Sequence, residues 1–276
     1  MSDLCDVFEL VFYREIAKTN FGGIMKKIAI VTGATGGIGM VFVRQICLMD
    51  DIDEVWAVGR NKDKLGLLKQ ENQKVVTIET DLGSDGVTVI QNLITEQTPD
   101  IRILVNNAGT GYMGPFEKME TDQVRALCKV NCSIPAELIS VAIPYMHEGA
   151  RILNISSASS FQPNPYLAMY SASKVYLKNL SRALYVELKP RKITATAVCP
   201  GWVDTGMLPR SKDGKEIKYA GMIDPETVVK KALRDSARGK DMSVPGFFAG
   251  YFRLYSKITP TKIVMYQWSR IIRKYI

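Results

Sequence analysis

The sequence has very few of the residues that most hydrolases and metalloenzymes use. It contains one histidine in 276 residues, His147. A single histidine argues against a serine or cysteine hydrolase triad and against a histidine-rich metal site, so we expect no bound metal. No Cys-x-x-Cys occurs and no disulfide-framework spacing is present, which predicts buried thiols in a reducing compartment. The five cysteines are Cys5, Cys47, Cys128, Cys132 and Cys199.

Long apolar runs and nucleic-acid motifs are also absent. No run of 18 or more apolar residues occurs, and Asp3 and Asp6 stand where a signal peptide would be positive. We therefore predict a cytoplasmic protein without a transmembrane span. Zinc-ligand spacings, aromatic-interleaved basic stretches and a helix-turn-helix signature are missing, so nucleic acid is not an expected partner. The net charge of +8 suits an acidic ligand such as a nucleotide, but it is equally compatible with a role in solubility.

What is present is the composition of a globular protein with a sizeable core, with 46% apolar and 23% charged residues. One alternating pattern predicts a single catalytic domain over 25–245. An N-terminal extension, 1–24, has apolar residues near helical spacing, which favours docking on the domain over membrane or subunit contact. The C-terminal segment 246–276 is aromatic and basic. It is predicted to be helical and to pack on the domain or a neighbouring subunit, with contact to anionic lipid as the alternative.

Short β-branched runs alternate with helical stretches along the domain. This order predicts an α/β protein, with a doubly wound parallel sheet in one Rossmann-type domain. The helical stretches include 121–145, which contains Asn131, and about 169–188. The predicted strands are 27–31, 54–58, 74–78, 102–105, 151–155 and 193–198.

A glycine-rich turn, 32–39, lies directly between the first strand and the following helix. Glycines there let backbone N–H groups approach a pyrophosphate, which the helix N-terminus also favours. The turn therefore predicts a dinucleotide site. Its candidate cofactor-binding residues are Gly33, Thr35, Gly37, Ile38 and Gly39.

Later strand ends supply the remaining cofactor candidates. The second strand is followed by Arg60 with no acidic residue in the turn, which favours the 2′-phosphate of NADP(H) and leaves NAD(H) possible. Asp81 is a candidate for the adenine amine or a helix cap. The turn at 199–205 is expected to face the nicotinamide. The further candidates are Leu82, Asn107, Ala108, Gly109, Pro200, Gly201, Val203 and Thr205.

Tyr170 and Lys174 form a candidate catalytic pair. Residues four apart share one helix face, so the ammonium would favour the ionised phenol and lower its pKa towards neutrality. Ser157 follows the fifth strand and could hydrogen-bond the same substrate oxygen. Tyr185 and Lys189 have the same spacing, but no serine stands thirteen residues before Tyr185. Such a pair alone is more often a solvated helix face, so the surrounding motifs distinguish Tyr170.

From about Lys26 to Val244 the sequence resembles a short-chain dehydrogenase/reductase. The motifs are Thr32-Gly33-x-x-x-Gly37-x-Gly39, Asn106-Asn107-Ala108-Gly109, Tyr170-x-x-x-Lys174 and Pro200-Gly201. The resemblance implies a catalytic tetrad of Asn131, Ser157, Tyr170 and Lys174. Tyr170 would then exchange a proton with a carbonyl or alcohol oxygen that Ser157 orients. Lys174 would bind the nicotinamide ribose and lower the tyrosine pKa, and Asn131 would hold a relay water.

The resemblance is nearest to hydroxysteroid dehydrogenases, which implies a steroid or bile-acid ketone or alcohol as substrate. A 3-ketoacyl thioester is the alternative, and a dinucleotide-binding sensor or scaffold without turnover is an alternative of another class. The family also implies a homotetramer or homodimer. Apolar residues beside the motifs predict a wide pocket. They are Tyr112, Met113, Phe161, Tyr166, Trp202, Met207 and Met222.

Overall fold

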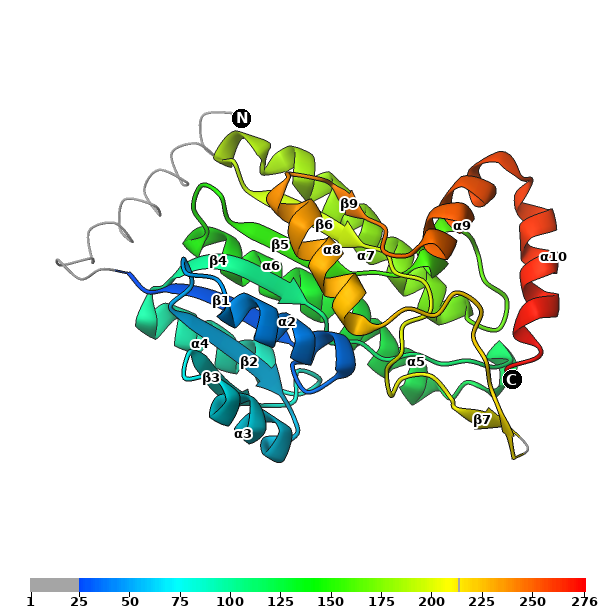
Figure 1. The fold of residues 1–276 in the computed structure, drawn as a ribbon, viewed down its shortest axis with the longest axis horizontal. Helices are drawn as coiled ribbons and strands as arrows, with labels where there is room; N and C mark the ends of the chain where they lie inside the picture. Colours follow the sequence, from blue (N-terminus) through cyan, green and yellow to red (C-terminus); the bar gives the residue numbers. More distant parts are fainter. Residues whose placement is uncertain (1–24, 213) are drawn as a thin grey trace.

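A computed structural model describes residues 25–212 and 214–276, so the predicted extension 1–24 lies outside the described residues. Its centre is a parallel seven-stranded sheet in the order β3-β2-β1-β4-β5-β6-β9 (Figure 1). The strands are β1 (Lys27–Thr32), β2 (Glu54–Gly59), β3 (Val75–Glu79), β4 (Asp100–Asn106), β5 (Arg151–Ile155), β6 (Thr194–Val198) and β9 (Met242–Ser243). The predicted fold class is confirmed.

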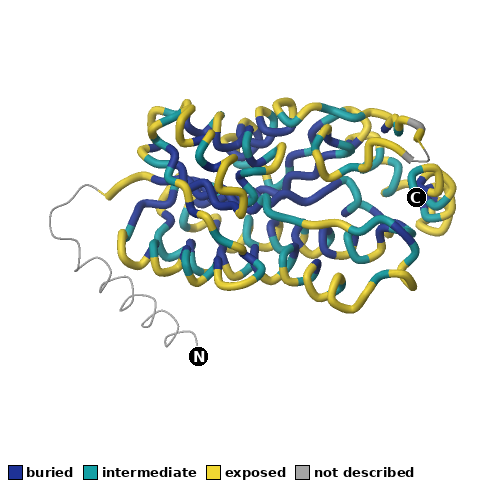
Figure 2. The backbone as a smooth tube through the Cα atoms, turned by 90° about the horizontal axis from the view of Figure 1, so that it is seen from below, coloured by how far each residue is buried: buried dark blue, intermediate teal, exposed yellow. Residues whose placement is uncertain are grey.

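Helices cover both faces of this sheet because successive strand residues point to opposite sides. Ala29 and Val31 of β1 pack in one apolar cluster, whereas Ile28 and Ile30 pack in the other. The first cluster includes residues of α2 (Gly37–Cys47), α3 (Lys62–Glu71) and α8 (Pro225–Ala237). The second includes residues of α4 (Gly86–Gln97), α6 (Ile134–Ala142) and α7 (Ala168–Glu187). In Figure 2 the buried strands form the dark centre between exposed outer helix surfaces.

The strand order reverses between β1 and β4. The chain moves outward from β1 through β2 to β3, then returns to place β4 on the other side of β1. At such a switch point the connections after the two strands diverge, and a crevice opens at their carboxyl ends. The topology therefore places a ligand site beside the loops after Thr32 and Asn106.

The helical stretch 121–145 is interrupted where Asn131 lies. α5 (Thr121–Cys128) passes through a π-helical turn, η2 (Lys129–Ser133), into α6 and then the 3₁₀ turn η3 (Ile143–Tyr145). Pro135 has no N–H to bond the carbonyl four residues earlier, which accounts for the break in the α-helical ladder at Asn131.

By length and composition this same stretch could cross a membrane. In the structure its exposed positions include Lys129, Ser133 and Glu137, while Leu138 and Ile139 pack under the sheet. It is therefore an ordinary flanking helix of the domain.

The chain after β9 forms two helices at one end of the molecule, α9 (Phe247–Ile258) and α10 (Thr261–Ile272), which we call the C-terminal hairpin (Figure 1). Trp268 and Ile272 pack on Leu167, just before α7. The remaining short elements are η1 (Phe116–Lys118), η4 (Ala158–Phe161), η5 (Lys189–Arg191), β7 (Ser211–Lys212) and β8 (Lys215–Glu216).

Candidate active site

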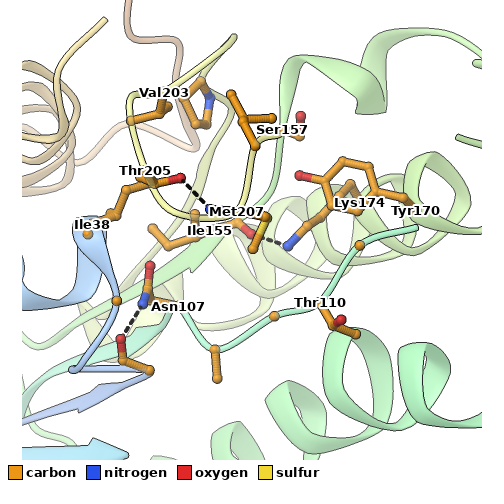
Figure 3. Close-up of a pocket in the computed structure, with 18 of the residues that line it drawn as sticks. Ile38, Asn107, Thr110, Ile155, Ser157, Tyr170, Lys174, Val203, Thr205 and Met207 are labelled. Carbon is orange, nitrogen blue, oxygen red and sulfur yellow. Dashed lines mark hydrogen bonds between the residues drawn. The ribbon is translucent and has the colours of Figure 1, made fainter. Parts of the chain in front are cut away.

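A cavity of about 900 Å³ lies at the carboxyl ends of the strands. Its walls come from the β1–α2 loop, the ends of β2 to β6, the N-terminal part of α7 and the C-terminal hairpin. Figure 3 shows Ile38, Asn107 and Thr205 around this space, each from a different segment of the chain, together with Tyr170 and Lys174 of α7. The fold thus brings residues from the whole length of the domain to one site.

The glycine-rich loop folds tightly at the start of α2. Gly33 has a φ of 63°, in the left-handed region that favours glycine. A Cβ at Gly39 would lie 2.1 Å from the Gly33 carbonyl oxygen, so no larger residue fits there without moving the loop. The loop leaves the helix N-terminus open towards the cavity, which is the arrangement that binds a pyrophosphate.

Asn107 fixes this loop from the neighbouring strand. Its Nδ2 donates to the carbonyl oxygens of Thr32 at 3.0 Å and Gly33 at 3.1 Å, and its backbone N–H donates to the Thr32 hydroxyl at 3.0 Å. Figure 3 shows one of these bonds from the Asn107 side chain. The side chain therefore ties the end of β4 to the end of β1. Asn107 lines the cavity, but its amide nitrogen is used to position the loop.

Two cations line the cavity at the carboxyl end of β2. They are Arg60 and Lys64, and no sequence motif pointed to Lys64. Arg60 Nη1 lies 3.7 Å from an oxygen of Asp81, and the Arg60 side chain is 78% exposed. Asp81 also accepts a hydrogen bond from the backbone N–H of Gly83. The turn after β2 thus carries cations and no carboxylate, which suits a ribose that bears a phosphate. The residues present therefore fit a dinucleotide.

The other cofactor candidates also reach the cavity, with one exception. Gly39 does not line the wall because it packs under Gly33. The residues that line the wall are Gly33, Thr35, Gly37, Ile38, Leu82, Ala108, Gly109, Pro200, Gly201, Val203 and Thr205.

Tyr170, Lys174 and Ser157 converge on one side of the cavity (Figure 3). α7 supplies the first two from adjacent turns, and Ser157 follows the end of β5. The Ser157 hydroxyl faces the Tyr170 phenol closely enough to lower its pKa. Lys174 is 5% exposed, donates to the Ile155 carbonyl at 2.9 Å and lies 5.6 Å from the centre of the Tyr170 ring. A phenol, a hydroxyl and an ammonium therefore face one point in the cavity.

The electrostatics of this group differ from the sequence-based expectation. Burial raises the pKa of Tyr170, and the nearby Ser157 hydroxyl opposes that rise only in part. Burial lowers the pKa of Lys174 to about 8. The expected lowering of the tyrosine pKa is wrong for the protein alone, because desolvation penalises both charged forms and the ammonium bonds the Ile155 carbonyl.

Asn131 lies directly behind Lys174. It is fully buried, its Oδ1 accepts from the Thr110 N–H at 2.9 Å, and its Nδ2 donates to the Thr110 carbonyl at 2.9 Å and to Ser173 Oγ at 3.0 Å. A Cβ at Gly109 would approach Asn131 Oδ1 to 3.3 Å and Lys174 Nζ to 3.4 Å. Asn131 therefore fixes the loop after β4 against the lysine, and its side chain does not line the cavity.

The second tyrosine–lysine pair has a different environment. Tyr185 packs against the apolar cluster under the sheet, and Lys189 is exposed at the start of η5. Neither residue lines the cavity. The spacing alone therefore does not identify a site, as the missing serine indicated.

The structure separates the substrate-pocket candidates into two groups. Tyr112, Met113, Trp202 and Met207 line the cavity, but Phe161, Tyr166 and Met222 do not. The Phe161 ring lies 5.7 Å from Lys178 Nζ, and the Tyr166 hydroxyl accepts from Arg273 Nε at 3.0 Å. Sequence proximity misplaced these two rings because the turns around them direct the side chains towards other partners.

The largest contribution that sequence reasoning missed comes from distant residues. Trp268 of α10 lines the cavity, stacks on Trp202 with ring centres 6.1 Å apart, and donates from Nε1 to the Pro165 carbonyl at 3.0 Å. Phe248 and Phe252 of α9 also line it. Buried Gln162 and Asn164 add polar groups, and Gln162 Oε1 has no partner among the described residues. No local motif links these residues to Tyr170, although the sequence shows that the segment containing Phe248, Phe252 and Trp268 is rich in aromatic residues.

Comparison with known proteins gives concordant matches. The family model described as short chain dehydrogenase matches residues 27–216. The human protein named inactive hydroxysteroid dehydrogenase-like protein 1 is 29% identical over 219 residues, covering 74% of this chain and 65% of the human protein. This chain thus spans less than two thirds of that relative's length.

Two further matches are informative. The very-long-chain 3-oxoacyl-CoA reductase of Anas platyrhynchos is 30% identical over 250 residues, covering 86% of this chain and 77% of the duck protein. The crystal structure of a bulky-bulky ketone specific alcohol dehydrogenase from Comamonas testosteroni aligns with a TM-score of 0.66 at 25% identity, covering 79% of this chain and 85% of that one.

Proposed function

Because this chain belongs to the short chain dehydrogenase family, we propose that it is an NAD(P)-dependent oxidoreductase interconverting a secondary alcohol and a ketone. The observation that carries the proposal is the convergence of Ser157, Tyr170 and Lys174 at the wall of a cavity whose other end fits a dinucleotide. A binding-only protein has no need of a phenol held between a hydroxyl and a buried ammonium.

Each residue has a defined task in this chemistry. A bound nicotinamide dinucleotide supplies or accepts the hydride. In the reductive direction Tyr170 donates its proton to the substrate oxygen, and Ser157 donates a hydrogen bond to that same oxygen. The raised pKa keeps Tyr170 protonated at neutral pH, which is the form that reduction needs. Asn131 fixes the loop after β4 beside Lys174, and Lys174 would contact the nicotinamide ribose.

The substrate we propose is a bulky apolar ketone or its alcohol. The cavity wall near Tyr170 is formed by Met113, Trp202, Trp268 and Phe252. A hydroxysteroid or bile acid is our first proposal, and a 3-oxoacyl thioester is the alternative, in line with the names of the two relatives. Gln162 and Asn164 offer polar contacts that would orient either molecule.

A dinucleotide-binding sensor without turnover is the second candidate. The observation in its favour is the human relative, whose name describes it as inactive. Against it stands the intact group of Asn131, Ser157, Tyr170 and Lys174 in this chain. The two candidates differ in whether a bound dinucleotide is oxidised or reduced.

NADP(H) is the cofactor we propose, since Arg60 and Lys64 both line the cavity after β2. We also propose a cytoplasmic homodimer or homotetramer joined through the long helices that carry Asn131 and Tyr170. In support of that assembly, α7 exposes Tyr176 and Val186.

Tyr170→Phe tests the proposal, with Tyr185→Phe as the matched control. We expect Tyr170→Phe to lower kcat for ketone reduction by about 10²- to 10⁴-fold and to leave NADPH binding, followed by fluorescence, nearly unchanged. The Tyr185→Phe protein should keep its rate because that ring packs outside the cavity. Steroid ketones and 3-oxoacyl thioesters are the substrates to compare. NADPH binding without turnover of any of them would favour the sensor.

A further inference from the structure

α9 exposes apolar side chains on its outward face. Phe247, Tyr251, Leu254 and Ile258 are 88%, 54%, 60% and 73% exposed. Their spacing of four, three and four residues places them along one side of the helix. The side of a surface helix that faces water is ordinarily polar, so this stripe needs an explanation.

The interior of the protein does not account for this stripe. The inward side of α9 is already used, because Phe248, Ala249 and Phe252 line the cavity. Of the fifteen large apolar side chains that are exposed in the described residues, eight lie in the C-terminal hairpin. Concentrated exposure of this kind marks an interaction surface.

Charge on the hairpin has one sign only. Residues 246–276 contain six lysines and arginines and no aspartate or glutamate, whereas the whole chain has a net charge of +8. On α10, Lys262 and Arg270 are exposed beside Ile263 and Tyr266. The surface is therefore apolar and cationic, and no aspartate or glutamate of the described residues is paired with its lysines or arginines.

The combination of exposed apolar side chains and positive charge favours an anionic bilayer over a second copy of the chain as the partner of the hairpin. In a twofold contact the same patch meets itself, so a second copy would bring lysines and arginines against lysines and arginines. An anionic bilayer instead neutralises the cations with its headgroups and accepts the aromatic and aliphatic side chains at the acyl boundary.

We propose that the C-terminal hairpin docks this protein on the surface of anionic membranes. Phe247, Tyr251, Leu254 and Ile258 of α9 insert at the headgroup boundary, and the basic side chains of both helices contact lipid phosphates. The hairpin stands at one end of the molecule (Figure 1), so the sheet and its flanking helices do not obstruct its approach to a flat surface. This docking is separate from the catalytic proposal.

Vesicle flotation of the purified full-length protein tests the docking directly. We expect the protein to float with vesicles of equal parts phosphatidylglycerol and phosphatidylcholine and to remain unbound with phosphatidylcholine alone. Raising the salt concentration should release it, because exposed charges are screened. Binding of equal strength to both vesicles, or to neither, would overturn the proposal.

Two sets of variants assign the contact to the hairpin. The double substitution Phe247→Ser and Leu254→Ser should weaken binding roughly tenfold or more through lost apolar insertion. Leu48→Ser with Leu67→Ser is the matched control, since these residues are 72% and 55% exposed elsewhere. Lys262→Gln, Arg270→Gln and Lys274→Gln together should weaken binding to anionic vesicles roughly a hundredfold. Lys118→Gln, Lys189→Gln and Lys230→Gln make the control for charge.

Self-association is measured on the same proteins by sedimentation. Docking predicts that Phe247→Ser with Leu254→Ser has the oligomeric state of the wild type. If that variant dissociates into smaller species and the wild type does not bind vesicles, the stripe is a contact between copies and the membrane proposal is wrong.

Discussion

At the scale of single residues, Lys174 is the group with the most altered environment. A lysine whose pKa falls from 10.5 to about 8 on folding is disfavoured as an ammonium in the folded state. The buried ammonium is stabilised by its hydrogen bond to the Ile155 carbonyl and by its contact with the Tyr170 ring.

Lys174→Met should change the pH dependence of stability. Between about pH 8 and 10.5 the unfolded chain keeps the lysine proton that the folded protein has lost, so wild-type stability gains with rising pH. The variant lacks this gain. We expect the wild-type minus variant free energy of unfolding to increase by about 2 kcal/mol from pH 7 to 9.5, measured by urea denaturation without cofactor.

The subtraction is necessary because other groups titrate in the same range. Burial raises the pKa of Cys47 to about 11 and also raises the pKa of Cys199 and Tyr170. The contribution of each of these groups to the free energy of unfolding therefore falls as the pH rises. The Cys47 contribution is common to both proteins and cancels, whereas those of Cys199 and Tyr170, which interact with Lys174, cancel only in part. A difference that stays constant from pH 7 to 9.5 would mean that Lys174 keeps its ordinary pKa.

Arg60→Asp tests cofactor preference at the opposite end of the cavity. Arg60 lines the cavity and is paired only loosely with Asp81, so its guanidinium is available for a phosphate. We expect the ratio of kcat/KM for NADPH to that for NADH to fall roughly ten- to hundredfold, the effect of one charge-assisted hydrogen bond. Lys62→Asp is the control, since Lys62 is exposed outside the cavity. An unchanged ratio in Arg60→Asp would exclude contact with a 2′-phosphate.

At the scale of elements, the sequence predicted the strands well where apolar runs were long. The first two predicted strands differ from β1 and β2 by one residue each. β9 was missed because a strand of two residues, Met242–Ser243, has no periodic pattern. The stretch 121–145 was predicted as one helix, and its π turn was missed because that turn depends on Pro135, a feature that hydrophobic periodicity does not detect.

The convergence of Ser157, Tyr170 and Lys174 on one cavity was predictable because these residues sit on sequence motifs, and their catalytic role stays a prediction. The walls of the substrate end were not predictable, because they depend on tertiary contacts. Trp268 reaches Trp202 only because α10 folds back onto the residues before α7. Phe161 and Tyr166 show the converse error, since nearness in sequence to Ser157 and Tyr170 did not place them in the cavity.

At the scale of the whole molecule, two parts with different roles share the cavity. Both large apolar clusters of the sheet draw their buried residues from the chain up to Leu233, and none comes from the C-terminal hairpin. The hairpin is held through the smaller cluster of Leu167, Trp268 and Ile272 and by the ring contacts of Trp202. The end of the cavity beside the glycine-rich loop and Arg60 is therefore built without the hairpin, whereas the end beside Trp202 depends on it.

A chain truncated after Pro245 should separate these two roles. We expect it to unfold cooperatively and to bind NADPH with unchanged affinity, because the sheet, the glycine loop and Arg60 all remain. The KM for a bulky ketone should rise at least roughly tenfold, since the walls formed by Phe248, Phe252 and Trp268 are lost. Trp268→Ala should give a smaller rise in the intact chain. Loss of NADPH binding in a truncated protein that still unfolds cooperatively would show that the hairpin also shapes the dinucleotide end.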